Sequence, residues 1–321
     1  MQLRHLRIEV PATDIFNGSS RYLVALLATS DESNVKDTAL FDEMTVYLHG
    51  FPDMSVHPTR VDFASRMPAK LADFFMNQRL EKKKRAFLTF NFGGIPGSDD
   101  ELRFTDKTIS QEVQDTVAVC HYIRSHLLGP VNGRLHVVGL STGAILGALL
   151  RDKQVADTIT VIAGLLDLTK GVHFDFNQLQ LEQCSSQGWC WKEFYLEEGC
   201  PLPKNVEISL DGVHSTTERI NDTTAPSKVF VRLEERYIQE YYDGSLDIVQ
   251  AVSQPGLPPL LVIHGDADQD VPFENGKELF QAAAEPKTFL AIANANHLLS
   301  NSKHLKKACY AIRKHMTVME C

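Results

Sequence analysis

The 321-residue chain lacks the features that would place it in a membrane or send it out of the cell. Its longest apolar stretches, such as Val161–Leu166 and Leu257–Ile263, fall far short of the roughly 20 residues that a membrane-spanning helix needs. Its first five residues do not show the basic-then-apolar layout of a secretory signal. We therefore expect a cytoplasmic protein without an integral membrane segment.

The chain also lacks an excess of positive charge. It contains 32 Lys and Arg against 41 Asp and Glu, which gives a formal net charge of -9. Nucleic acids and anionic membranes attract basic surfaces, so neither is expected as the main partner. The length suffices for one large domain with an insertion, or for two domains.

Cofactor motifs are absent as well. The sequence has neither a phosphate-binding glycine loop with lysine nor a dinucleotide fingerprint, and Cys184, Cys190 and Cys200 are not spaced as zinc ligands. We therefore predict no cofactor and no metal. Because no secretion signal is seen, free thiols are expected, with a Cys184–Cys190 disulfide as the alternative.

Short apolar runs alternate with amphipathic stretches, a pattern typical of a mostly parallel sheet with helices on both faces. The expected strands are Leu3–Val10, Tyr22–Ala28, Thr45–His49, Ala86–Phe92, Leu135–Val138, Thr158–Ala163, Leu260–Ile263 and Thr288–Ala293. The expected helices are Pro68–Gln78, Ser110–Leu128, Ala144–Leu150, Glu274–Ala284 and Ser302–Met316. The first two strands are expected to form an antiparallel pair.

The alternation breaks between residues 166 and 250. We therefore predict an α/β core domain of residues 1–165 and 251–321 with a cap, or lid, insertion at 166–250. Within it Val231–Tyr242 is expected to form a helix, and Asp175 to be exposed to solvent. Trp189 and Trp191 are candidate substrate-binding residues, because an aromatic lid excludes water from a pocket. The alternative is that they only give the cap its own small core.

A serine between glycines follows the strand expected at Leu135–Val138. The run Gly139–Gly143 has the pattern Gly-x-Ser-x-Gly and leads into the small-residue helix Ala144–Leu150. On such a turn the hydroxyl is lifted clear of the sheet, and the glycines avoid clashes with neighbouring backbone. This context predicts that Ser141 is a nucleophile. A serine that only caps the helix is the alternative.

A serine hydroxyl needs a base that takes its proton. Of the twelve histidines, His297 is the best placed, because it follows the last expected strand in a polar loop. A carboxylate must then orient the imidazole. Asp266, Asp268 and Asp270 all follow the strand Leu260–Ile263, and periodicity does not choose among them.

The negative oxygen of a tetrahedral intermediate needs backbone N–H donors. Thr142, directly after the serine, can supply one, and the strand-ending turn His49–Pro52 can supply another from Phe51. A simple turn is the alternative there. His49 and Leu140 adjoin these donors and are candidate substrate-binding residues, although a core role also suits His49.

These residues together resemble the α/β-hydrolase superfamily, in particular its serine aminopeptidase-like and monoacylglycerol lipase-like members. The resemblance covers most of Thr45–Met316 outside the insertion. It rests on five motifs in chain order: His49–Pro52, Asn91–Ser98, Gly139–Gly143, His264–Pro272 and Asn296–His297.

The resemblance implies an α/β-hydrolase fold and a Ser-His-Asp triad. In the pattern H-G-x-x-D-x-x-V-P the acid stands three residues after the glycine, which selects Asp268 and leaves Asp266 and Asp270 as runners-up. It also implies Phe51 and Thr142 as oxyanion donors. The loop Asn91–Ser98 corresponds to a glycine-rich turn beside the site.

We therefore predict a serine hydrolase that cleaves a carboxylic ester or thioester of a small or lipid-like molecule through an acyl-enzyme. Peptide or amide cleavage and acyl transfer would use the same nucleophile and remain alternatives. A hydrolase-fold receptor with little turnover is a further one, because a fold does not fix a function. The expected partner is a small ester or acyl compound.

Overall fold

A computed structural model of the chain describes residues 1–11, 20–30, 40–77, 83–98, 102–130, 132–195, 207–210, 213–216 and 228–317. Its centre is an eight-stranded sheet in the order β1-β2-β4-β3-β5-β6-β11-β12. The strands are β1 (Gln2–Val10), β2 (Arg21–Thr29), β3 (Glu43–Leu48), β4 (Arg85–Phe90), β5 (Arg134–Leu140), β6 (Thr158–Ile162), β11 (Leu260–Gly265) and β12 (Lys287–Ile292). From β4 to β12 all neighbours are parallel, and β1 and β2 form the expected antiparallel pair at one edge.

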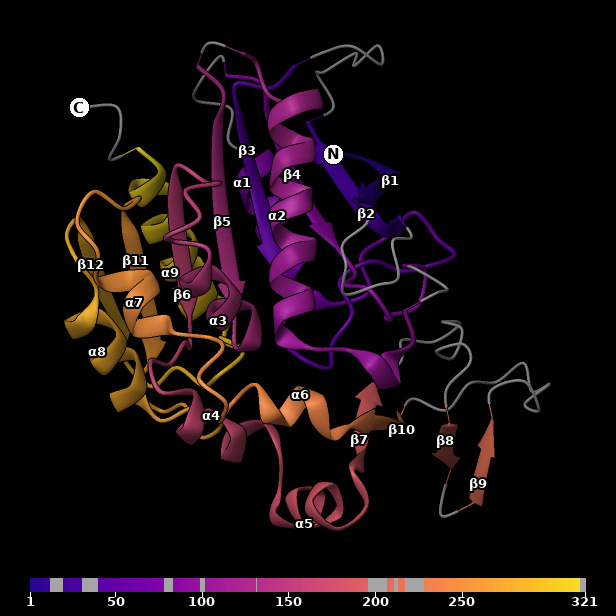
Figure 1. Cartoon of the computed structure of the whole chain (residues 1–321). Helices are drawn as coiled ribbons and strands as arrows, with labels where there is room; N and C mark the ends of the chain where they lie inside the picture. Colours follow the sequence, from indigo (N-terminus) through magenta and orange to yellow (C-terminus); the bar gives the residue numbers. More distant parts are fainter. Residues whose placement is uncertain are drawn as a thin grey trace.

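Helices cover both faces of this sheet (Figure 1). They are α1 (Arg66–Met76), α2 (Ile109–His126), α3 (Thr142–Leu149), α7 (Ile248–Ser253), α8 (Phe273–Ala282) and α9 (Ser302–Met316). Helices α1 and α9 pack on one face, and α2, α3, α7 and α8 lie on the other. The prediction of an α/β fold with helices on both faces is confirmed.

The period of two along the strands divides the core in two. On β5, Val137 belongs to the hydrophobic cluster under α2 and α3, whereas Val138 and Leu140 belong to the cluster under α1 and α9. On β11, Val262 and Ile263 divide in the same way. A strand that is buried on both faces has a continuous run of apolar residues. The sequence therefore predicts the bounds of these strands to within a few residues.

Residues 166–250, here called the intervening segment, follow β6 and run into the first residues of α7. Their elements are α4 (Leu168–Asp175), α5 (Gln178–Gln187), β7 (Trp189–Tyr195), β8 (Glu207–Leu210), β9 (Val213–Thr216), β10 (Lys228–Glu234) and α6 (Glu235–Gln239). The four strands form a separate antiparallel sheet in the order β7-β10-β8-β9. Figure 1 shows this segment below the large sheet, at the end toward which β5 runs.

The predicted helix over Val231–Tyr242 is wrong in its first half. Strand β10 continues to Glu234, and the helix α6 spans only Glu235–Gln239. The reason is the alternation of buried Val231 and Leu233 with partly exposed residues, together with antiparallel pairing to β7. Period-two burial outweighs the weak helical pattern of such a short run.

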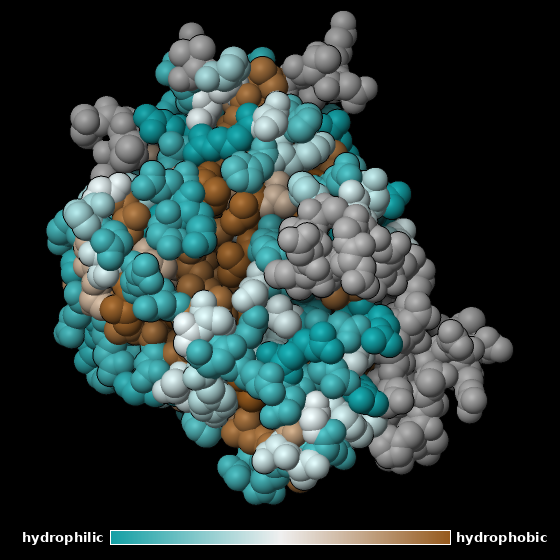
Figure 2. Space-filling view, in the orientation of Figure 1, coloured by the Kyte–Doolittle hydropathy of each residue, from teal (hydrophilic) through white to brown (hydrophobic). Residues whose placement is uncertain are grey.

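Figure 2 shows a narrow hydrophobic strip on one face of the molecule, bordered by hydrophilic residues. No helix in the described ranges combines the length and the apolar character needed to cross a bilayer. Cys120, Cys184, Cys190 and Cys309 are free thiols, as expected, so the alternative Cys184–Cys190 disulfide is not formed. Cys200 and Cys321 lie outside the described residues.

Candidate active site

Ser141 occupies the turn between β5 and α3. Its backbone angles, φ 58° and ψ -122°, lie in a region that L-residues with a side chain rarely adopt. The strained turn is fixed by a hydrogen bond from its N–H to the carbonyl of Ile162 on β6, 3.0 Å away. Its side chain makes no capping bond to α3, so its hydroxyl is not used to cap the helix.

The glycines on either side of Ser141 are there because of space. A Cβ atom on Gly139 would overlap the carbonyl group of Gly143, and one on Gly143 would overlap the carbonyl of Leu48 at the end of β3. Any side chain at either position would therefore push β5, α3 and β3 apart. The close approach also brings the turn after β3 against Ser141.

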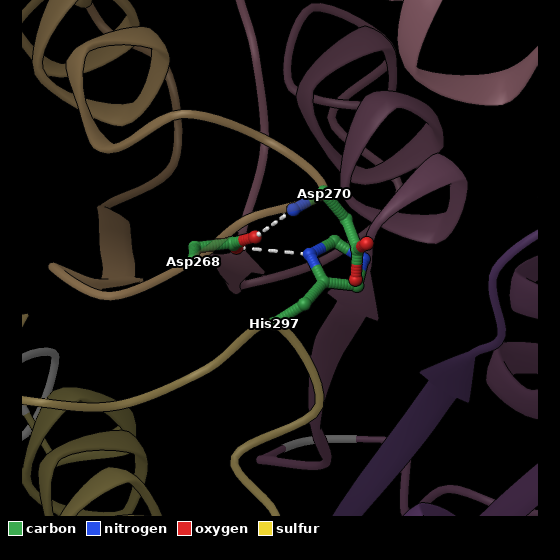
Figure 3. Close-up of side chains that lie close together, drawn as sticks. All are labelled: Asp268, Asp270 and His297. Atoms are coloured by element: carbon green, nitrogen blue, oxygen red, sulfur yellow. Dashed lines mark hydrogen bonds and ion pairs between the residues drawn. The ribbon is translucent and has the colours of Figure 1, made fainter.

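Asp268 and His297 are in direct contact across two loops. Asp268 follows β11 and His297 follows β12, and Oδ2 of Asp268 lies 2.9 Å from Nδ1 of His297 (Figure 3). A carboxylate only accepts hydrogen bonds, so Nδ1 carries the proton and Nε2 is left as the basic nitrogen. Ser141 follows β5, and β5, β6, β11 and β12 are adjacent parallel strands. All three residues therefore lie at the carboxyl ends of the strands, on the same side of the sheet.

Asp268 is held as an anion by its surroundings. Burial alone would raise its pKa, but hydrogen bonds from His264 and His297 and from the N–H of Val271 lower the pKa well below its ordinary value. Its Oδ1 accepts from the N–H groups of Asp270 and Val271, both at 2.9 Å. This carboxylate can orient an imidazole and stabilise its charged form.

The two runners-up are placed differently. Asp266 is exposed and accepts a hydrogen bond at 2.6 Å from the N–H of Asn294, which ties the loop after β11 to the loop after β12. Asp270 is exposed and its carboxylate lies beside the ring of His297, whereas only Asp268 hydrogen-bonds to that ring (Figure 3).

Among the described residues, Asp268, Asp270 and His297 form the one group of potential metal ligands that lie close together. One ligand atom from each lies within 4.8 Å of the others. In this arrangement, however, Nδ1 of His297 donates to Asp268, and both oxygens of Asp268 already accept hydrogen bonds. A metal bound to all three would have to displace bonds that the structure already satisfies, so the group fits a hydrogen-bonded pair better.

The turn after β3 lies against the nucleophile. A Cβ atom built on Gly50 would lie 3.2 Å from Cβ of Ser141 and 3.7 Å from its Oγ. The backbone N–H groups of Phe51 and Thr142 have no acceptor within the part of the chain that the structure describes. Both N–H groups therefore remain available as donors on either side of the turn that adjoins Ser141.

His49 and Leu140, two of the candidate substrate-binding residues, are buried. The pKa of His49 is lowered to about 4, mainly by burial and in part by the positive charge of Lys107. A hydrogen bond to Gly50 opposes this shift, and the ring is neutral near pH 7. Its Nδ1 donates to the carbonyl of Gly50 at 2.8 Å, and the ring packs 4.7 Å from that of Phe92. Leu140 packs in the core under α1 and α9, which gives no support to a role in binding substrate.

The loop Asn91–Ser98 supports the turn from behind. The side chain of Asn91 accepts from the N–H groups of Ser55 and Val56 and donates to the carbonyl of Pro96. The hydroxyl of Ser98 donates to the carbonyl of Asn91 at 2.6 Å. All of these groups are buried, so the loop is a fixed wall of the site.

Beneath this loop is a network of buried charges. Lys107 donates to the carbonyl of Gly93 at 2.7 Å and pairs with Glu112 at 2.9 Å. Arg21 pairs with Asp115 at 2.7 Å, and Asp115 accepts from the N–H of Gly93 at 2.9 Å. The network fixes Gly93 from two sides.

The intervening segment meets the site at the ring of Phe51. Tyr237, in the middle of α6, stacks on this ring with centroids 4.4 Å apart. Lys192 of β7 places its ammonium 5.7 Å from the same ring. Because side chains alternate along a strand, Trp189 and Trp191 lie on the opposite face of β7, where their rings contact each other at 5.2 Å. That placement gives no support to the prediction that these two tryptophans bind substrate.

Three buried or partly buried charged residues near the site belong to no sequence motif: Lys107 beneath the loop Asn91–Ser98, and Asp175 and Lys192 in the intervening segment. Asp175, expected to be exposed, accepts a hydrogen bond at 2.6 Å from the hydroxyl of Tyr241, and burial raises its pKa. The prediction that it is exposed is therefore wrong, because α4 ends against Tyr241 and β7. The available sequence signal is the alternation Cys190, Lys192, Phe194. In a strand these three side chains share one face, which places the lysine among apolar residues.

Comparison with known proteins shows the fold. No model of a known protein family matches the chain. The uncharacterized protein YfhR of Escherichia coli is 29% identical over 91 residues, a match that spans 28% of either chain. Over nearly the full length the structure resembles a putative hydrolase from Agrobacterium vitis (TM-score 0.63, 15% identity, 98% of this chain and 100% of the other). It also resembles the α/β hydrolase GrgF from Penicillium (0.61, 15%, 99% and 100%) and an esterase domain from Rhodothermus marinus (0.54, 17%, 98% and 99%). The chain has the α/β-hydrolase fold.

Proposed function

We propose that this protein is a serine hydrolase that cleaves a carboxylic ester or thioester of a small or lipid-like substrate. Ser141 is the nucleophile, His297 the base and Asp268 the acid of the triad. Phe51 and Thr142 donate their backbone N–H groups to the oxyanion, and the intervening segment acts as the cap over the site. No metal or cofactor takes part in this chemistry.

One observation carries the proposal. A serine in a strained backbone conformation stands at the same edge of a parallel sheet as a histidine whose Nδ1 is held by a buried carboxylate. Backbone strain of this kind is kept where the surrounding structure over-determines it, and such positions cluster at active sites. A serine that only capped α3 would need neither the strain nor the histidine.

The steps follow from these positions. Nε2 of His297 takes the hydroxyl proton as Oγ of Ser141 attacks the acyl carbon, and the carbonyl oxygen becomes negative between the two N–H groups. Asp268 stabilises the imidazolium, which then gives its proton to the leaving alcohol or thiol. A water molecule, activated by His297, releases the acid from Ser141.

The fold neighbours include an esterase domain and proteins described as hydrolases, which supports this class of reaction over a receptor role. The motifs do not separate ester from peptide cleavage. We favour esters because the ring of Phe51 is partly exposed and is backed by the buried rings of Phe104 and Tyr237, so the surface beside the proposed oxyanion donors is apolar.

The test is a panel of chromogenic esters of increasing acyl length, measured on the wild type and on Ser141→Ala. We expect turnover by the wild type and a loss on the order of 10⁶-fold in Ser141→Ala, down to assay background. The best acyl length would give the depth of the pocket. Turnover that survives in Ser141→Ala would disprove the assignment, and no turnover of any ester would favour a peptide substrate or a receptor.

A further inference from the structure

Lys192 is an unusual residue for its place in β7. The face of β7 and β10 that packs toward the site carries Cys190, Phe194, Val229, Val231 and Leu233, all buried and apolar. Lys192 stands in the middle of this face, opposite Val231, and is only 6% exposed. A leucine or methionine would complete the hydrophobic surface at far lower cost than a buried ammonium group.

The charge of Lys192 is left with unused hydrogen-bonding capacity. Its ammonium has three N–H donors, and one of them goes to the backbone carbonyl of Asp175 at the end of α4. Among the described residues no carboxylate oxygen lies within 4.0 Å of it. Its other neighbours are the rings of Phe176, at 4.6 Å, and Phe51, at 5.7 Å. Burial lowers its pKa, with Asp175 and Glu193 opposing the shift.

The carboxylate of Asp175 is engaged elsewhere. It accepts the hydroxyl of Tyr241 at 2.6 Å, and it acts on the charge of Lys192 from a distance greater than that of an ion pair. It is also close enough to His297 for a positive charge on that ring to lower the pKa of Asp175. Lys192 therefore stands beside the proposed site and not in a remote part of the segment.

The position of Lys192 relative to the proposed chemistry is set by Phe51. The N–H of Phe51 is the proposed oxyanion donor, its ring lies below Lys192, and the preceding Gly50 touches Ser141. A ligand that reaches from Ser141 to Lys192 must therefore pass along Gly50 and the ring of Phe51, which favours an extended chain over a compact group.

From this arrangement we infer that Lys192 binds a carboxylate at the far end of the acyl group, so that the preferred substrates are monoesters of dicarboxylic acids. The inference rests on the proposed hydrolase function and adds the class of acyl group. The two N–H donors of Lys192 without an acceptor would take the carboxylate oxygens, and the methylene chain would pack on the partly exposed ring of Phe51. Charge-assisted hydrogen bonds in a dry site are the strong ones.

The experiment compares methyl monoesters of C4 to C8 dicarboxylic acids with methyl esters of monocarboxylic acids of the same chain length, by release of methanol. The quantity that decides is the ratio of kcat/KM for the acidic ester to that for its neutral match. We expect the ratio to exceed 1 for at least one length in the wild type and to fall about 10- to 100-fold in Lys192→Met.

Two further variants separate binding of a charge from simple packing. Asp175→Asn still accepts from Tyr241 but removes a competing negative charge, so the ratio should rise. Lys170→Met removes an exposed lysine of the same segment that pairs with Glu278 at 3.1 Å, so the ratio should not change. A ratio that is the same in the wild type, Lys192→Met and Asp175→Asn would overturn the inference, even if all rates fell together.

A failure of the hydrolase proposal would give a different result from a failure of the Lys192 inference. In that case no ester of either series would be cleaved in a way that depends on Ser141. The inference would then be judged by calorimetry with the monomethyl esters on the wild type and on Asp175→Asn. Binding of the acidic ester at least tenfold tighter than its neutral match would support it, and equal binding would overturn it.

Discussion

Two buried lysines, Lys107 and Lys192, lie near the His49–Phe51 turn, and their surroundings differ. Lys107, from the loops of the large sheet, is completely buried, pairs with Glu112 and donates to Gly93. Lys192, from the intervening segment, has one backbone acceptor and two aromatic rings. A buried charge whose partners are all present holds a structure together, whereas one with donors to spare is suited to a ligand.

The same contrast holds for the two regions as a whole. In the large sheet, the loop Asn91–Ser98 is fixed by backbone and side-chain hydrogen bonds and by two buried ion pairs. The intervening segment reaches the site through aromatic contacts with Phe51 and Phe176. The sheet side of the candidate site is thus fixed by polar contacts, whereas the intervening segment contacts it through aromatic rings.

The largest effect on stability is expected from replacing Lys107. Lys107→Met leaves the carboxylate of Glu112 buried without its partner, and we expect the free energy of unfolding to fall by about 3–5 kcal/mol. Lys192→Met breaks no close ion pair in the described residues, so its stability should stay within about 1 kcal/mol of wild type. Urea denaturation measures both, and an equal loss in the two variants would show that the lysines have the same role.

A somewhat smaller effect is expected from His49, which lies on the side of the turn that faces Lys107. Its pKa is 6.5 in an unfolded chain and about 4 in the folded protein. Protonation therefore favours the unfolded chain, so the stability gained from the neutral ring is complete above pH 6.5 and is lost as the pH falls toward 4. This amounts to about 3 kcal/mol over that window.

The check on this prediction is the difference between two proteins, because other groups titrate in the same range. Stability is measured by urea denaturation at several pH values between 4 and 7 for the wild type and His49→Gln. The wild type should lose more stability than the variant as the pH falls. Parallel curves would mean that His49 is protonated equally in the folded and unfolded chains.

The smallest effect on stability is expected from removing one hydroxyl group in the intervening segment. Tyr241→Phe removes the hydroxyl that donates to the partly buried Asp175, and we expect a loss of about 1–2 kcal/mol in the free energy of unfolding. Tyr237→Phe is the matched control, because the buried hydroxyl of Tyr237 has no partner among the described residues. Its removal should cost nothing. A larger loss for Tyr237→Phe than for Tyr241→Phe would contradict the contacts described here.

The sequence predicted the large sheet well because its strands are buried on both faces and its motifs stand at strand ends. Because β5, β6, β11 and β12 are parallel, Ser141, Asp268 and His297, which each follow a strand, lie at the same end of the sheet. The choice among Asp266, Asp268 and Asp270 came from the resemblance, because local pattern does not show which carboxylate points toward a loop from another strand. In the structure only Asp268 hydrogen-bonds to His297.

The intervening segment was predicted poorly for a physical reason. Its strand β10 pairs with β7 some 40 residues away in sequence, and such pairing leaves only a short alternation in the local sequence. The aromatic composition of the segment predicts Trp189 and Trp191 as substrate-binding residues, but both lie on the outer face of β7. Lys192, one position away, faces the site, and only the strand register shows this.

The central claim is that Ser141 is a nucleophile activated by His297. It is tested most directly by treating the protein with a fluorophosphonate, which reacts with activated serines, and locating the adduct by peptide mass spectrometry. We expect one adduct on Ser141 in the wild type, none in Ser141→Ala, and labelling at least 100-fold slower in His297→Ala. Labelling of a different serine, or labelling of Ser141 at the same rate without His297, would contradict the account.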